Sequence, residues 1–216
     1  MRNAESIIKL SICILIYTTA CISEKSGKIR NGDIVFRANT ESDLSKAIND
    51  VTQTQEKFNY THIGICEVVN NEVYVYHASS NRGVCKDLLS EFCQPIKNSY
   101  FIVDLYRIND FNEEQIDRAI TKADALLDKS YNETYILEDE GYYCSEYIYE
   151  LFKTDSVFTL EPMTFKESVT NNFHPVWVDY YSKLGIAIPE GQLGCNPNGM
   201  ANNKNITLIK NIYTSE

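Results

Sequence analysis

Cys144 stands at the start of a segment, residues 142–152, whose pattern predicts a helix. Ile148, Leu151 and Phe152 form an apolar stripe at helical spacing. A cysteine in the first helical turn meets unpaired backbone N–H groups and the positive end of the helix dipole. Both favour the thiolate, which is the nucleophilic form, so we expect a lowered thiol pKa. An isolated cysteine is more often a buried structural residue, so a catalytic interpretation needs a base nearby.

Two histidines, His62 and His77, lie in two β-branched runs at residues 61–69 and 72–78. The two runs are joined by the Asn-Asn pair at 70–71, a sequence typical of a tight turn. Together they predict a β-hairpin that carries one histidine on each strand.

The register of this hairpin places the two histidines together. A two-residue loop pairs Val69 with Glu72 and, counting back, Gly64 with His77. His62 and His77 then share one face as diagonal neighbours, about 7–8 Å apart at the backbone. Either histidine alone would be interpreted as an ordinary core or surface residue. Two on one face, beside a glycine that leaves space, favour a functional pair.

A thiol, an imidazole and a group that orients the imidazole are the requirements of acyl transfer through a thioester. In this hypothesis Cys144 is the nucleophile, His62 is the general base and acid, and His77 orients His62. Backbone N–H groups at the helix start would hold the oxyanion. Tyr143 and Ser145, which flank the nucleophile, are the candidates for substrate contacts.

The remaining pattern predicts the elements that must position these residues in one α+β domain over residues 32–216. No internal repeat interrupts it, and four prolines divide a looser part between the Cys144 helix and the C-terminus. The expected elements are a strand at 32–37, a helix through 44–51 capped by Thr40, a strand at 100–107, a helix through 116–127 capped by Asn112, and a final strand at 206–213.

Composition and charge narrow the class of protein. The chain has 216 residues, 44% of them hydrophobic, which suffices for one domain with a core. Twenty basic residues stand against 30 acidic ones, a net charge of −10. This balance argues against a nucleic-acid partner, because phosphates need Lys and Arg to neutralise them. The 15 tyrosines suit either the wall of a cleft or ordinary amphipathic packing.

The N-terminus has the pattern of a targeting segment. A basic start and a short apolar run end in small residues at 18–20, directly before Cys21. We expect residues 1–20 to be a signal peptide, Cys21 to be lipidated, and residues 21–31 to form a polar tether. Thr18 departs from the usual lipobox leucine, so ordinary cleavage near Ala20 stays open. The expected location is the bacterial cell envelope, as a membrane-anchored lipoprotein facing the periplasm or the cell surface.

Five cysteines remain in the expected mature domain after Cys21. An odd number in an exported chain implies at least one free thiol. Cys85 and Cys93 could form a disulfide, which the sequence does not decide. No pair has the spacing of a zinc motif, so we expect neither a metal site nor a cofactor. The five are Cys66, Cys85, Cys93, Cys144 and Cys195.

Three motifs, in this order, resemble a known family. They are Gly-Asp-Ile-Val-Phe at 32–36, Thr-His-Ile-Gly-Ile at 61–65 and Tyr-Cys-Ser-Glu at 143–146. Together they resemble the circularly permuted NlpC-type papain-like family, the YiiX/YaeF-like amidases, over nearly all of the mature chain. The resemblance implies a papain-like fold in which an antiparallel sheet carrying histidine packs against a helix carrying cysteine.

The same resemblance implies hydrolysis of an amide, often in cell-wall peptides. By position, His62 and Cys144 match the catalytic pair of the family, and His77 matches its third polar position, where this branch often has Glu. The expected function is therefore a cell-envelope cysteine hydrolase acting on peptidoglycan-derived peptides. A lipid acyltransferase or thioesterase on the same fold, and a non-catalytic envelope binding module, are the alternatives.

Overall fold

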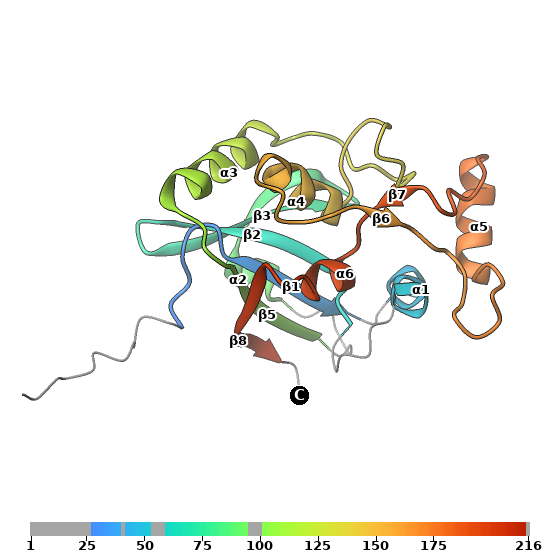
Figure 1. The fold of residues 1–216 in the computed structure, drawn as a ribbon, viewed down its shortest axis with the longest axis horizontal. Helices are drawn as coiled ribbons and strands as arrows, with labels where there is room; N and C mark the ends of the chain where they lie inside the picture. The colour runs from blue at the N-terminus through green and yellow to red at the C-terminus, as the bar shows by residue number, and fades with distance from the viewer. Residues whose placement is uncertain (1–26, 40–41, 53–58, 95–100, 215–216) are drawn as a thin grey trace, which may run out of the picture.

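The computed structural model describes residues 27–39, 42–52, 59–94 and 101–214. Its centre is a six-stranded antiparallel sheet with the strand order β4-β3-β2-β1-β5-β8 (Figure 1). The strands are β1 (Ile34–Asn39), β2 (His62–Val69), β3 (Glu72–Ser79), β4 (Gly83–Leu88), β5 (Phe101–Ile108) and β8 (Ile206–Thr214). A separate two-stranded ladder joins β6 (Glu161–Pro162) to β7 (Leu193–Gly194).

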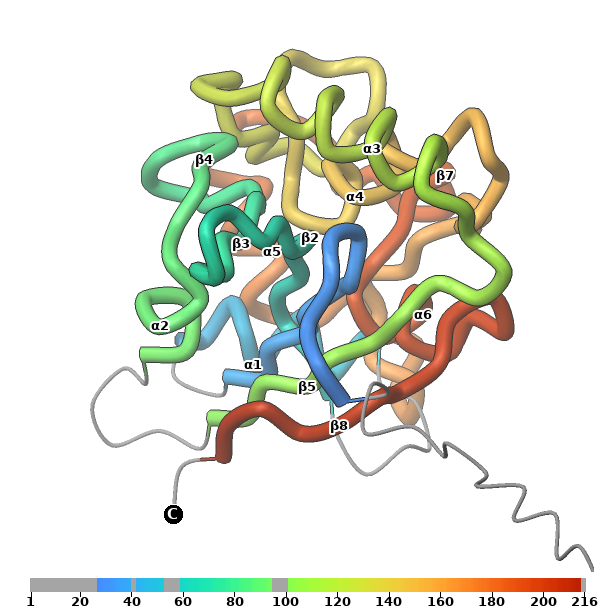
Figure 2. The backbone as a smooth tube through the Cα atoms, turned by 90° about the vertical axis from the view of Figure 1, so that its left-hand side faces the viewer, coloured from blue at the N-terminus to red at the C-terminus, as the bar shows by residue number. Residues whose placement is uncertain are grey.

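Helices surround this sheet. In Figure 1, α3 and α4 cover β2 and β3, whereas α1 and α5 stand together at the other end of the molecule. The helices are α1 (Asp43–Thr52), α2 (Leu89–Phe92), α3 (Glu113–Ala125), α4 (Cys144–Phe152), α5 (Pro175–Leu184) and α6 (Pro197–Ala201), with a 3-10 turn at Lys153–Asp155. Figure 2 shows β8 running along β5 at the edge of the sheet.

Alternate residues of the central strands supply two cores, one on each face of the sheet. Phe36 and Ile63 pack with Ile148 of α4 on the helix-covered face. Val35 belongs to the opposite face, where it packs in a cluster that includes Phe92 of α2. Because successive side chains of a strand point to opposite faces, this pattern determines the face of every site residue on β2 and β3.

The histidine hairpin has the predicted register. Val69 pairs with Glu72 and Ile65 with Tyr76, which brings Gly64 opposite His77 at the next step. Asn70 and Asn71 both have positive φ, 51° and 68°, as a two-residue hairpin loop of this twist requires. The loop that joins β2 to β3 therefore sets the register that makes His62 and His77 neighbours on one face of the sheet.

The structure changes some expectations from the sequence and decides one question that the sequence left open, while other expectations fall outside the described residues. Helix α1 begins at Asp43, and Ser42 caps it by accepting a hydrogen bond from Ser45 N (2.9 Å), while Thr40 lies outside the described residues. The C-terminal part is more ordered than expected, because α5, α6 and β7 occupy it. Cys85 and Cys93 are free thiols rather than a disulfide. The expected signal, lipidation and most of the tether precede residue 27 and are not described.

Among the residues that the structure describes, no helix reaches the length and apolar character that a bilayer crossing requires.

Candidate active site

A cavity of about 770 Å³ lies at the ends of β2 and α4. His62 is the first residue of β2 and Cys144 is the first residue of α4, and both side chains line this cavity. The sheet and the helix thus bring together the two residues that the sequence pairs as base and nucleophile, although 81 positions separate them in the chain.

The two histidines are joined directly. His62 Nε2 lies 2.8 Å from His77 Nδ1, and the two rings stand nearly perpendicular, at 88°. His62 also stacks on Phe92 of α2, with ring centroids 5.6 Å apart. A hydrogen bond on one side and an aromatic ring on the other restrict the orientation of His62.

Asp87 extends this chain of contacts. Its Oδ2 lies 3.0 Å from His77 Nε2, and its Oδ1 accepts a hydrogen bond from Arg82 Nη1 at 2.9 Å. The hydrogen bonds from Arg82 and then His77 hold the pKa of Asp87 down to about 2. The carboxylate can therefore only accept.

This acceptor assigns the protons of both imidazoles. His77 Nε2 carries a hydrogen and donates it to Asp87, so His77 Nδ1 must accept from His62 Nε2–H. The remaining nitrogen of His62, Nδ1, then holds a free lone pair. Asp87, His77 and His62 form a relay, named here the Asp87 relay, that leaves His62 in the tautomer a general base needs.

Cys144 lies in the other layer of the fold and lines the same cavity as His62. The histidines lie on the sheet face of Phe92, whereas α4 packs on the opposite face, and the cavity at the strand end is where the two meet. Within the described part of the chain, the Cys144 thiol makes no hydrogen bond to His62. Catalytic hydrogen bonds are often long without substrate and tighten in the complex.

The expected low pKa of Cys144 is wrong for this resting state. Burial raises the pKa of the thiol to about 11, although Ser145 N–H at the start of α4 and the Arg37 guanidinium both oppose the rise. Burial, Arg37 and His77 in turn hold the pKa of His62 well below its usual range. The desolvation free energy of a buried thiolate exceeds the stabilisation that the start of α4 and the Arg37 cation provide. The resting pair is therefore a thiol and a neutral imidazole.

Arg37 is a cation inside the site that the sequence did not single out. It pairs with His62 across the β1–β2 ladder, and its guanidinium lies over the Phe92 ring at 4.9 Å. One of its nitrogens, Nη1, donates to Phe92 O at 3.3 Å, while the buried Nε has no hydrogen-bond partner among the described residues. The Arg37 side chain lines the cavity, so it can attract a negative group on a bound molecule.

Tyr143 and Ser145, the predicted substrate contacts, both line the cavity but are almost fully buried. Their hydroxyls hold Cys195: Ser145 Oγ donates to its carbonyl at 3.0 Å, and Tyr143 Oη accepts from its N–H at 3.2 Å. These bonds attach the segment after β7 to the start of α4. A direct role of either residue in binding substrate stays a prediction.

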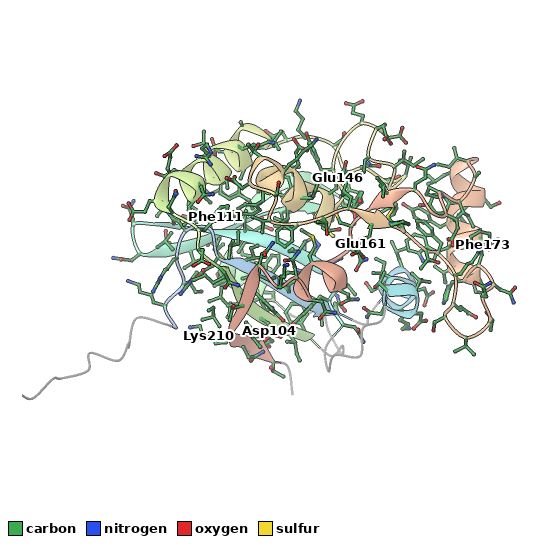
Figure 3. The ribbon with its side chains drawn as sticks, viewed as in Figure 1. Asp104, Phe111, Glu146, Glu161, Phe173 and Lys210 are labelled. Carbon is green, nitrogen blue, oxygen red and sulfur yellow. The ribbon has the colours of Figure 1, made fainter. Side chains whose placement is uncertain are left out.

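Glu146 completes the start of α4. Its carboxylate accepts hydrogen bonds from Tyr143 N at 3.0 Å and from Asn132 Nδ2 at 3.1 Å (Figure 3 labels Glu146 on the helix layer above the sheet). Burial raises the pKa of Glu146 to about 7. Asn132 also accepts from Thr134 N, so Glu146 links α4 to the loop that carries Tyr135 of the aromatic wall.

Aromatic residues form one wall of the cavity. Tyr135 lies 5.2 Å from Tyr143 and 5.6 Å from Trp177 of α5, and Phe165 lies 5.1 Å from Trp177, all measured between ring centroids. Trp177 is buried, and its Nε1 has no hydrogen-bond partner among the described residues. The tyrosine-rich segment near residues 131–143 thus contributes to a cavity wall, one of its two expected roles.

Three residues of the site were missed from the sequence: Asp87, Arg37 and Phe92. Asp87 joins His77 because β4 pairs with β3, and β4 was not predicted as a strand. The segment Gly83–Leu88 does not alternate apolar and polar residues, so the sequence holds little local signal for this strand. Arg37 and Phe92 reach the site through tertiary packing, for which no local signal exists.

The model of the permuted papain-like amidase family, YaeF/YiiX, C92, matches residues 28–210. The fold resembles a solved structure described as the metalloprotein YiiX of Escherichia coli O157:H7, with a TM-score of 0.66 and 21% identity, covering 86% of this chain and 97% of that one. No curated protein matches at the significance required.

The chain belongs to the permuted papain-like amidase family. The family match and the fold likeness confirm the α+β permuted papain-like architecture, with the histidine-bearing sheet and the cysteine-bearing helix. The family is one of amidases, which makes hydrolysis the activity class of this fold.

Proposed function

We propose that this protein hydrolyses an amide bond through a thioester on Cys144. The observation that carries the proposal is the Asp87 relay, which leaves a free lone pair on Nδ1 of His62, a residue that lines the same cavity as Cys144. A buried structural cysteine would need no oriented base beside the same cavity.

The reaction begins with a neutral pair. His62 Nδ1 takes the Cys144 proton as Sγ attacks the carbonyl carbon, so no free thiolate accumulates. The oxyanion accepts hydrogen bonds from backbone N–H groups at the start of α4. His62 then gives its proton to the leaving amine, and a thioester remains. Water, activated by His62, cleaves the thioester and restores the thiol.

His77 and Asp87 act during both proton transfers. When His62 becomes an imidazolium, its Nε2–H still donates to His77 Nδ1, and His77 still donates to the Asp87 carboxylate. A neutral imidazole alone stabilises a neighbouring imidazolium poorly. The carboxylate of Asp87, the next member of the relay after His77, supplies this missing negative charge.

The substrate class we propose is a peptide, derived from peptidoglycan. The cavity is also lined by residues with amide and hydroxyl side chains, among them Asn39, Thr52, Asn196 and Asn203. Such polar groups suit the amides of a peptide better than a uniformly apolar acyl chain. Arg37 offers a cation for a peptide carboxylate.

The test compares products from muropeptides and from phospholipids. Purified protein should release an amine from muropeptides, and Cys144→Ala should release none. Cys93→Ser replaces a free thiol that does not line the cavity, so it is the matched control and should keep the activity. Fatty-acid release from phospholipid instead would identify an acyl-lipid enzyme, and no product from either substrate would support a binding module.

We further propose that the protein is attached to the cell envelope through Cys21. The support is the apolar run that ends directly before this cysteine. Native protein should partition into detergent and incorporate labelled fatty acid, and Cys21→Ser should abolish both. Labelling that persists in Cys21→Ser would refute the lipid anchor without affecting the proposed hydrolysis.

A further inference from the structure

Three donor atoms converge on the far side of His77. Cys85 Sγ lies 3.6 Å from His77 Nε2, and Asp87 Oδ2 lies 3.0 Å from the same nitrogen. The nitrogen, the sulfur and a carboxylate oxygen all lie within 4.8 Å of one another. His77 is buried, while Cys85 and Asp87 are partly accessible from the surface.

The β3–β4 ladder creates this cluster. His77 pairs directly with Cys85, and Asp87 follows two residues later on the same face of β4. The spacing between His77 and Cys85 is that of a short hairpin, which explains why no zinc-motif spacing is visible in the sequence.

Two of the three donor separations can be compared with those around a small tetrahedral metal ion. Zn–S near 2.3 Å and Zn–N near 2.05 Å at a tetrahedral angle give an S···N edge of about 3.6 Å, and Zn–N with Zn–O gives about 3.4 Å. The first edge matches the observed separation, and the second requires the 3.0 Å contact to open by a few tenths of an ångström. One nitrogen, one sulfur and one oxygen are ligands typical of zinc.

We propose that His77, Cys85 and Asp87 bind Zn²⁺, with water as the fourth ligand. His77 Nε2, the Cys85 thiolate and Asp87 Oδ2 supply the bonds. Arg82 donates to both oxygens of Asp87, from Nη1 to Oδ1 at 2.9 Å and from Nη2 to Oδ2 at 2.5 Å. When the ion binds, Nη1 keeps its bond to Oδ1, whereas Nη2 must move away from Oδ2 to make room for the metal. The thiolate and the carboxylate together neutralise the ion. One proton, from Cys85, leaves the protein when the metal binds.

Metal binding reverses the hydrogen bond between the two histidines. Nε2 of His77 gives up its hydrogen to bind the ion, so the His77 proton must sit on Nδ1 and is donated to His62 Nε2. The proton of His62 then moves to its Nδ1, the nitrogen that serves as the base. The pair exchanges tautomers without a net change in protons, and His62 can no longer accept the Cys144 proton.

Zinc at this site is therefore an inhibitor of the hydrolase, a consequence that rests on the proposed function. The metal site itself does not depend on it. Binding and inhibition are measured separately so that either can fail alone.

Cobalt serves as the spectroscopic probe for binding. Titration of the metal-free protein with Co²⁺ should give a thiolate-to-cobalt charge-transfer band that saturates at one equivalent. Cys85→Ser and Cys85→Ala should remove the band, and Asp87→Asn should weaken Co²⁺ binding by about tenfold or more. Cys93→Ser and Cys144→Ala should retain the band, because neither thiol belongs to the cluster.

Two results would overturn the metal site: a band that survives both Cys85 variants, or a band that disappears in Cys144→Ala and so belongs to the nucleophile. For inhibition, Zn²⁺ should block amide hydrolysis by the wild type, and Cys85→Ser should need at least about tenfold more Zn²⁺. Equal sensitivity of the two proteins would refute the inhibitory role. Absence of hydrolysis from metal-free protein would refute the proposed function and leave the cobalt result standing.

Discussion

His62 Nε2 and His77 Nδ1 lie 2.8 Å apart, and the next bond of the chain, from His77 Nε2 to Asp87, is 3.0 Å long. A carboxylate at the end of this chain gives both hydrogen bonds one direction. The proton positions of a histidine pair are otherwise ambiguous, so Asp87 converts two equivalent tautomers into one.

The nucleophile and base are tested by Cys144→Ala and His62→Ala. Each should lower kcat/KM for amide hydrolysis by about 10³-fold or more, because both act in the same steps. His77→Ala should leave measurable activity, since it orients the base without touching the substrate. Thermal unfolding should show that the Cys144 and His62 variants remain folded. Appreciable turnover by Cys144→Ala would assign the reaction to another group.

The relay is tested by Asp87→Asn. The amide removes the negative charge and can donate as well as accept, so His62 is no longer held in one tautomer. We therefore expect kcat to fall by roughly 10- to 100-fold, with little change in KM. Glu67→Gln is the matched control, because Glu67 of β2 forms an ion pair at 2.6 Å with Lys86, the neighbour of Asp87 on β4, and makes no hydrogen bond to His77. If both variants lose activity equally, the Asp87 charge has no special role.

The resting state of the thiol is tested by its alkylation at different pH values. Because burial raises the pKa of Cys144 to about 11, only about one thiol in 10⁴ is ionised at pH 7. The rate of modification by iodoacetamide, measured on the Cys144 peptide by mass spectrometry, should keep rising above pH 9. A reactive plateau below pH 7 that disappears in His62→Ala would instead indicate a preformed thiolate–imidazolium pair.

Glu146 predicts a pH-dependent stability. Its pKa is about 7 in the folded protein, above its ordinary 4.5. The contribution of the protonated carboxyl to the free energy of unfolding is therefore fully present below about pH 4.5 and is lost as pH rises through 7. Glu146→Gln should therefore exceed the wild type in unfolding free energy by about 1–2 kcal/mol at pH 8. At pH 5 the difference should nearly vanish. A difference that does not change with pH would show that Glu146 ionises normally.

The strand position opposite His77 has no room for a side chain larger than that of Gly64. A Cβ added there would collide with the Val75 side chain and approach Tyr76 O to 3.0 Å and His77 Cβ to 3.4 Å. Gly64→Ala should cost about 1–3 kcal/mol of unfolding free energy and reduce activity by displacing His77. Gly27→Ala, where a Cβ meets nothing within 4 Å, should change neither, and chemical denaturation of the two variants makes the comparison.

The predictions made from the sequence succeeded where local patterns decide the structure. The Asn70–Asn71 loop specifies the register of β2 and β3, and the apolar stripe of α4 places Cys144 at a helix start. Both features depend on residues that are close together in the sequence. The family motifs span the same elements, so fold and family followed from them.

The predictions failed where burial and long-range packing decide. The pKa of Cys144 depends on how much water the surrounding layers exclude, which a helix pattern does not contain. Asp87 enters the relay because an edge strand with mixed polarity pairs with β3. Arg37 becomes a site residue because β1 pairs with β2, after 24 intervening residues that include another helix.

Trp177 is the only tryptophan of the chain, and it borders the cavity. All indole fluorescence therefore originates beside the candidate substrate site, within 5.6 Å of Tyr135 between ring centroids. A molecule that enters the cavity changes the polarity around this one fluorophore. Occupancy of the site can thus be followed optically, in the wild type and in variants that perform no chemistry.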